Sequence, residues 1–210
     1  MTTGISAPPA ALMNRYAVNM PGKVEVIWQP LYHYQQYAAG GALTFTFFQN
    51  PIGQGGNTLS DTNMVSAGQI PKGQKFVITA IQVELYPVAA DIYDATPDQD
   101  RFLRDYYNVM QSDANLQLLI GSKPYLQQAP LMKFPQAQRV NASTSIATGG
   151  ATIEGMSFAQ GGGQPFNIVP LTLTSNQNFS VTINFDAVVA ISTAAKFGVT
   201  LQGFLFRNAQ

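Results

Sequence analysis

The sequence predicts an all-β protein, an antiparallel β-sandwich with one inserted helix. Apolar and polar residues alternate with a period of two in several short stretches, which is typical of strands with one buried face. Segments rich in Gly, Pro, Asn and Gln separate these stretches, as loops do. Only one stretch repeats its apolar residues at helical spacing. Among sandwiches, the long excursions between strands favour a single jelly roll.

Two regions are expected along the chain. Residues 1–22 are predicted to form an N-terminal arm, because Pro8, Pro9 and Pro21 discourage regular structure while apolar residues can still pack onto something. Such an arm either docks on a neighbouring subunit or frays. Residues 23–210 are predicted to form a single jelly-roll domain, a length that suits one all-β unit.

The expected strands follow in order along this domain. Trp28 and Leu43 are placed on the apolar faces of the first two strands, and the clearest alternation covers residues 179–185. The last strand carries Phe204 and Phe206 opposite its main apolar face, so both of its faces are expected to be covered near its end. The predicted strands are residues 23–28, 43–48, 75–85, 116–120, 168–174, 179–185 and 197–206.

Residues 140–163 form a long segment of mostly small side chains. They are expected to be either an extended surface loop or a pair of weak strands. Segments of this length inside a compact domain are usually functional or interfacial.

One helix is predicted over residues 97–111. Thr96 can cap it, and Pro97 suits the first helical position. Asp98 and Asp100 would then lie in the first turn, where the helix dipole favours anions. The acidic side chains of this region are expected to lie on a solvated helix face.

Charge is scarce in this chain. Only 10% of residues are charged, against about 25% in an ordinary soluble domain, and the 11 basic and 11 acidic residues cancel. A net charge near zero promotes association. The polar content is mostly neutral, with 20 Gln and 13 Asn, and neutral groups can be covered at an interface without the desolvation cost of ions.

Composition also excludes several classes of function. The chain has no Cys, which excludes disulfides and Cys-ligated zinc. We expect no secretory signal and no transmembrane segment, because no apolar run is long enough. Scattered Lys and Arg give no basic stripe, so no sequence-specific binding of nucleic acid is expected. These observations do not exclude contact of the protein with an internal membrane.

The sequence contains no recognisable set of catalytic residues. His33 is the only histidine, and neither a nucleophile-elbow pattern nor a glycine-rich phosphate motif is present. We expect His33 to be a loop or interface residue, the protein not to be an enzyme, and no cofactor to be bound. Asp91 and Asp94 are weak candidates for a calcium site, since their region is acidic but lacks the spacing of a known calcium loop.

Several blocks of sequence resemble jelly-roll capsid proteins of tailless bacteriophages. They include residues 58–64, 67–74, 76–83 and 170–173, and the ending at 199–207, where the Leu-x-Gly-x-x-x-Arg pattern runs from Leu201 to Arg207. The resemblance covers about half of the chain. It implies a subunit of a virion shell. Many major shell subunits carry two jelly rolls, whereas 210 residues with an arm leave room for one.

The expected function is therefore that of a viral structural protein. Its partners would be copies of itself and other virion proteins, and its location the virion. The alternative is a phage fibre or baseplate component, or a secreted carbohydrate-binding sandwich. Five residues are expected to anchor interfaces: Tyr16, Tyr32, Tyr34, Tyr37 and Arg207.

Overall fold

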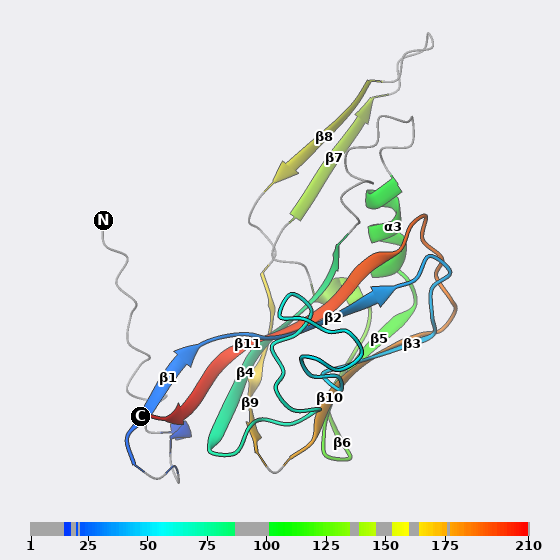
Figure 1. The fold of residues 1–210 in the computed structure, drawn as a ribbon. Helices are drawn as coiled ribbons and strands as arrows, with labels where there is room; N and C mark the ends of the chain where they lie inside the picture. Colours follow the sequence, from blue (N-terminus) through cyan, green and yellow to red (C-terminus); the bar gives the residue numbers. More distant parts are fainter. Residues whose placement is uncertain are drawn as a thin grey trace, which may run out of the picture.

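A computed structural model of the chain describes residues 15–17, 20, 22–86, 101–134, 139–145, 153–159, 164–175 and 177–209. For residues 101–104, 139–145 and 153–159 only the backbone is described. Within these ranges the protein is an antiparallel β-sandwich, as predicted (Figure 1).

The first sheet is built around its longest strand, β11 (Ala195–Asn208). On one edge β11 pairs first with β2 and then with β1, and on the other edge it pairs with β4. β9 pairs with the far edge of β4. The bounds of the partner strands are β1 Val24–Trp28, β2 Leu31–Tyr37, β4 Gln74–Tyr86 and β9 Phe166–Thr174.

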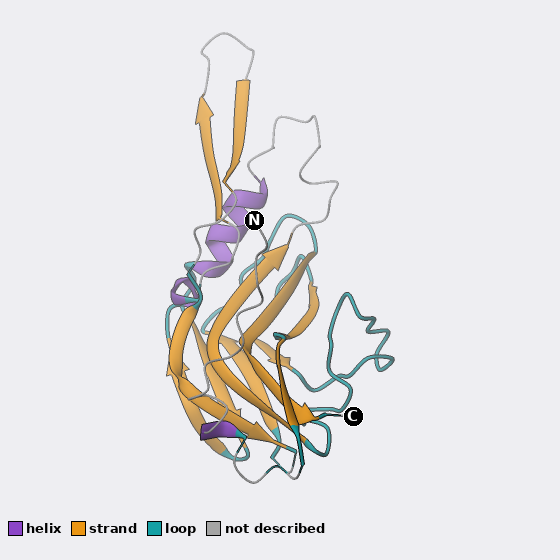
Figure 2. Cartoon of the chain, turned by 90° about the vertical axis from the view of Figure 1, so that its left-hand side faces the viewer, coloured by secondary structure: helices purple, strands orange, loops and turns teal. Residues whose placement is uncertain are grey.

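The second sheet has the strand order β3-β10-β5-β6, and all its neighbours are antiparallel. Its strands are β3 Thr44–Phe47, β5 Ala114–Ile120, β6 Lys123–Gln128 and β10 Phe179–Phe185. A short 3-10 helix, η1 (Leu131–Lys133), follows β6. Figure 2 shows the two sheets as packed layers.

The strand pairs of the sandwich are nested. The strand β2 pairs with β11, β3 with β10, and β4 with β9, and the consecutive strands β5 and β6 form the innermost pair. A long antiparallel ribbon that is rolled into two layers has this order. Each sheet therefore contains strands from both ends of the domain.

The remaining elements lie at one end of the sandwich in both views. A hairpin of β7 (Arg139–Ser145) and β8 (Ile153–Ala159) stands beyond the sheets, beside helix α3 (Arg101–Met110) (Figures 1 and 2). Of the two expectations for residues 140–163, the pair of strands is the one observed. The predicted helix is present, while its proposed start at Thr96 and Pro97 lies outside the described residues.

The core lies between the two sheets and is rich in aromatic rings. Tyr37 stacks on Phe45 with ring centroids 5.0 Å apart. Phe197 meets Phe45 and Phe47 edge to face, at 5.1 and 5.7 Å. Such packing adds about 0.5–1.5 kcal/mol per pair beyond the burial of area.

The alternating patterns are borne out for most strands. All four large apolar residues of β10 are buried, and the expected cover on both faces of β11 is present at Phe206. Two placements are wrong: Trp28 is 73% exposed and Leu43 is 50% exposed. Trp28 lies on the outer face of the first sheet, and Leu43 precedes β3, so neither side chain enters the core.

One glycine makes the central pairing possible. The register of β11 against β4 shifts between Gln202 and Gly203, which leaves Thr79 as an extra residue on β4. The Thr79 hydroxyl donates to the Gln202 carbonyl at 3.2 Å. A Cβ atom on Gly203 would overlap the carbonyl oxygen of Val77, so only glycine allows this close approach of the two backbones.

Gly203→Ala is therefore expected to lower the free energy of unfolding by at least about 2 kcal/mol. The obstructing atom belongs to the backbone of β4 and cannot move without breaking the ladder. The measurement is urea denaturation at equilibrium. Gly40→Ala is the matched control, because no atom lies within 4 Å of its added Cβ. Equal midpoints for the two variants would contradict this account.

Candidate functional site

The tyrosine-rich segment, residues 30–37, is not a loop. Its residues 31–37 form β2, with Leu31, His33 and Tyr37 buried and Tyr32 and Tyr34 half-buried on the opposite face. Sequence reasoning missed this strand because its polar residues hid the alternation. The three expected interface tyrosines therefore do not share a surface.

Tyr37 is corrected from an interface residue to a core residue. Its side chain is fully buried, and its hydroxyl donates to the carbonyl of Val189 at 2.6 Å. Burial raises the pKa of Tyr37 to about 12. A side chain enclosed in this way has no surface to offer another molecule.

His33 is likewise a core residue and not a loop or interface histidine, since it is 1% exposed. Its Nδ1 accepts the backbone N–H of Phe48 at 2.5 Å. Phe48 has a φ of 70°, a left-handed conformation that is costly for an aromatic residue. The imidazole thus holds a strained residue at the end of β3, and burial lowers the pKa of His33.

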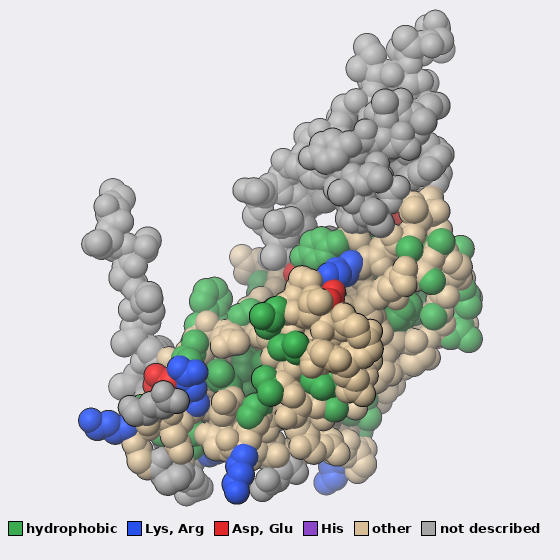
Figure 3. All heavy atoms as spheres, viewed as in Figure 1, with side chains coloured by type: hydrophobic (Ala, Val, Ile, Leu, Met, Phe, Trp, Pro, Cys, Tyr) green, Lys and Arg blue, Asp and Glu red, His purple; other side chains and the backbone are tan. Residues whose placement is uncertain are grey.

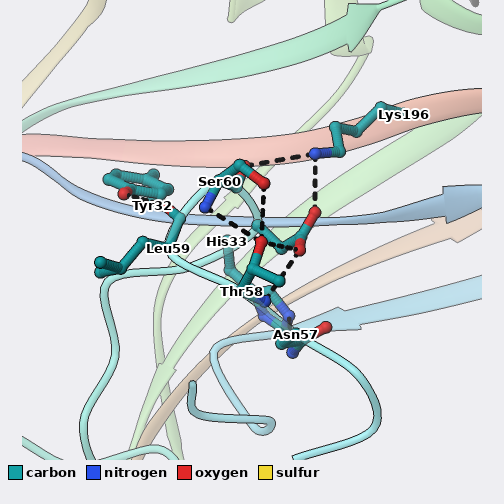
Figure 4. Close-up of polar contacts among 8 residues, drawn as sticks. Tyr32, His33, Asn57, Thr58, Leu59, Ser60 and Lys196 are labelled. Atoms are coloured by element: carbon teal, nitrogen blue, oxygen red, sulfur yellow. Dashed lines mark hydrogen bonds and ion pairs between the residues drawn. The ribbon is translucent and has the colours of Figure 1, made fainter. Parts of the chain in front are cut away.

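A loop runs along the free edge of β2 beside this histidine and pairs with it through the backbone (Figure 4). Asp61 organises the loop by accepting hydrogen bonds from the backbone N–H and the hydroxyl of Thr58, at 2.9 and 2.7 Å. Lys196 of β11 pairs with Asp61 at 2.6 Å and also donates to the carbonyl of Ser60. The Lys196 ammonium and the two Thr58 donors lower the pKa of Asp61 to about 2.

Three further hydrogen bonds, made by the side chains of Tyr32 and Asn63, fix this loop to β2 and the residue before it. The Tyr32 hydroxyl donates to the carbonyl of Leu59 at 2.5 Å. The Asn63 amide donates to the carbonyl of Pro30 at 2.7 Å and accepts from the N–H of Tyr32 at 3.0 Å. Tyr32 therefore has a structural role in positioning the loop.

Tyr34 lies across the outer face of the first sheet. A Cβ atom on Gly198 would overlap its ring, so the ring lies directly over this glycine of β11. Its hydroxyl donates to the carboxylate of Glu84 on β4. Thr200 donates to the same carboxylate at 3.1 Å. Burial, and then the Glu84 charge, raise the pKa of Tyr34.

Glu84 is thus a buried carboxylate held by hydroxyl groups. It is 5% exposed, and Tyr86 joins Tyr34 at this site with ring centroids 5.7 Å apart. Burial raises the pKa of Tyr86 to about 12. Hydroxyl donors satisfy the carboxylate here, so the arrangement needs no bound ligand.

The other two expected interface residues lie at the opposite end of β11. Tyr16 packs on Phe206 with ring centroids 6.2 Å apart, so the described part of the arm covers the outer face of the first sheet. Arg207 is exposed and pairs with Glu25 of β1. Both contacts lie within one chain, and the interface role of the two residues stays a prediction.

The acidic region differs from expectation at Asp105 of α3. This carboxylate is 8% exposed and accepts the N–H and hydroxyl of Ser192 at 2.7 and 3.2 Å, so it is not part of a solvated face. Asp91 and Asp94 lie outside the described residues. Among the residues that are described, no three His, Asp or Glu side chains gather as metal ligands.

Among the described residues, the polar contacts of His33 are with a backbone N–H and a side-chain amide. The one histidine uses its Nδ1 on a backbone N–H, and its Nε2 lies 3.5 Å from the Asn57 amide. No helix in the described ranges is both long and apolar enough to cross a bilayer. The arrangement presents two surfaces, the outer face of the first sheet and the hydrogen-bonded loop along β2.

Comparison with known proteins found no protein-family model, no curated protein and no solved structure that matches this chain.

The sole histidine makes stability depend on pH. Burial lowers the pKa of His33 in the folded state, whereas in the unfolded chain the imidazole keeps its ordinary pKa of 6.5. The unfolded chain therefore binds a proton at a higher pH than the folded protein does. Stability is therefore full above about pH 6.5 and falls as the pH drops below it, by at most ~1.4 kcal/mol per pH unit. Thermal unfolding between about pH 7.5 and 5.5 measures this slope. His33→Gln, although less stable, should lose the dependence; an unchanged slope would contradict the assignment.

Tyr34→Phe is expected to destabilise the protein by about 1–3 kcal/mol, because the buried Glu84 carboxylate loses a donor. Chemical denaturation measures the change in unfolding free energy. Tyr125→Phe is the control, since Tyr125 is 50% exposed on the edge strand β6. A loss for Tyr34→Phe no greater than that of the control would show that the hydroxyl does not stabilise the carboxylate.

Proposed function

We propose that this chain is a viral structural protein, a single jelly-roll subunit that assembles into a bacteriophage shell through protein–protein contacts. The nested strand pairs of the sandwich support a jelly roll, the architecture found in many viral capsid and lectin domains. The sequence blocks that resemble capsid proteins of tailless phages agree with this proposal. Its partners would be further copies and other virion proteins.

One observation carries the proposal: three large apolar side chains are exposed near one junction of the fold. Trp28, Leu59 and Val65 are 73%, 66% and 72% exposed. They lie around the same junction, since the loop that contains Leu59 and Val65 is tied through Asn63 to Pro30, two residues after Trp28. We call these three residues the loop patch.

The loop patch is suited to contact with protein. Large exposed Trp residues are the commonest energetic anchors of interfaces, and apolar side chains rimmed by polar ones mark interaction surfaces. The loop beneath the patch is rigid, because Asp61, Lys196 and Tyr32 all hold it. A rigid surface loses little entropy on binding. These properties favour a subunit contact over a catalytic role.

A second candidate function is that of a carbohydrate-binding sandwich, and one observation supports it. Tyr32, Tyr34 and Tyr86 form an aromatic row across the first sheet, with successive ring centroids 5.7 Å apart. Their rings are tilted by 39° and 59°, which makes the row less flat than a sugar-stacking platform would be. We therefore rank this candidate second.

Assembly of the purified protein tests the first candidate against the second. Electron microscopy and sedimentation velocity are expected to find shells, rings or other large particles that grow with concentration. A protein that stays monomeric at high concentration and binds an oligosaccharide would refute the shell proposal and favour the carbohydrate-binding one.

Trp28→Ser is expected to raise the protein concentration needed for assembly roughly thirty-fold, which corresponds to about 2 kcal/mol. Sedimentation velocity over a concentration series measures this shift. Val169→Ser is the matched control, because Val169 is 81% exposed but lies on β9, at the other edge of the first sheet. Equal shifts for both variants would mean that the loop patch is not a specific contact.

A further inference from the structure

A polar pocket opens at the end of the sandwich where β1 begins and β11 ends. Its volume is about 530 Å³, and the loop between β3 and β4 completes its wall. The lining residues are Glu25, Lys72, Gly73, Gln74, Arg207, Asn208 and Ala209. None of the three loop-patch residues lies among them, although Arg207 is also one of the residues predicted to anchor an interface.

Hydrogen-bond donors predominate in this lining. Four side chains supply them: Lys72, Gln74, Arg207 and Asn208. Within the described part of the chain, the only polar contact of these side chains is that of the Arg207 Nε with Glu25. The terminal nitrogens of Arg207 and the ammonium of Lys72 are therefore available to an acceptor that enters the pocket.

Further positive charge lies near the pocket. Lys23 is exposed beside it, and its carbonyl accepts the N–H of Ala209 at 2.8 Å. Arg15 is exposed at the same end of β11, next to Tyr16, but it lies on the other face of the sheet, because Tyr16 packs on Phe206 and not on Arg207. Figure 3 shows several Lys and Arg side chains spaced apart along this end of the molecule, with an acidic side chain beside one of them. In a chain with so few charges, folding brings Lys23, Lys72 and Arg207 from separate segments to this end of the sandwich.

We infer that this pocket binds phosphate groups of a nucleic acid strand without reading its sequence. Arg and Lys donors with neighbouring amides are the usual partners of backbone phosphates. Exposed cations beyond the pocket suit a polymer with repeated charges better than a single small anion. The lining holds no large apolar side chain to insert into a bilayer, which argues against a lipid headgroup. This inference does not depend on the proposed shell function.

The test is fluorescence anisotropy of a labelled oligonucleotide of mixed sequence, titrated with the full-length protein at several salt concentrations. Lys72→Gln should weaken binding roughly five- to tenfold, through the loss of a charge-assisted hydrogen bond. It should also reduce the salt slope by about 0.7 for single strands. Glu25→Gln should tighten binding, because it removes the one carboxylate and frees Arg207. If Lys72 and Glu25 only stabilised the fold, the two substitutions would not change oligonucleotide binding in opposite directions.

Lys133→Gln is the matched control, since Lys133 is an exposed cation outside the pocket whose ammonium donates to Gln128. Unfolding midpoints of all variants confirm that the fold is kept. Oligonucleotide binding that is the same for Lys72→Gln, Glu25→Gln and the wild type would overturn the inference. So would binding to vesicles of anionic phospholipid, or to inorganic phosphate, when the oligonucleotide does not bind.

Discussion

The rest of the structure depends on the pairing of β11 with three other strands. One strand of 14 residues joins the first strands of the domain to β4, so β1 and β2 belong to this sheet only through β11. Two glycines make this crowded position possible. Gly198 lies beneath the ring of Tyr34, and Gly203 lies against the backbone of β4. Larger residues at these points would separate strands that share one core.

This constraint also explains why polar groups are buried on the outer face of the sheet. Gly198 brings Tyr34 down onto the sheet, where its hydroxyl reaches Glu84 on the far side of β11. Gln82 and Gln202 pair through their side-chain amides at 2.8 Å further along the same face. Neutral polar side chains, abundant in this chain, satisfy one another there at little desolvation cost. The few ionic contacts that are described hold loops and strand ends instead, as between Lys196 and Asp61.

Much of the fold could be predicted from the sequence, because strands with one buried face carry their own signal. The bounds of β10 were predicted from alternation alone, and α3 from helical spacing. By contrast, β2 was missed, since its inward positions include His33 and its outward positions include Tyr34, so apolarity did not separate the faces. Tyr37 was misplaced for the same reason. Its burial is decided by Phe45 and Phe197, which lie far away in the sequence.

The sequence by itself determined the class of the fold, the scarcity of charge and the absence of cysteine chemistry. These are properties of composition and of local periodicity, which need no knowledge of distant contacts. Only the tertiary structure decided which surfaces exist. Folding ties the loop of Asp61 to Lys196 and gathers Lys72 and Arg207 around one pocket, although both pairs are separated by more than half the chain. Nested strand pairing brings early and late segments together, so such clusters have no signature in any single stretch of sequence.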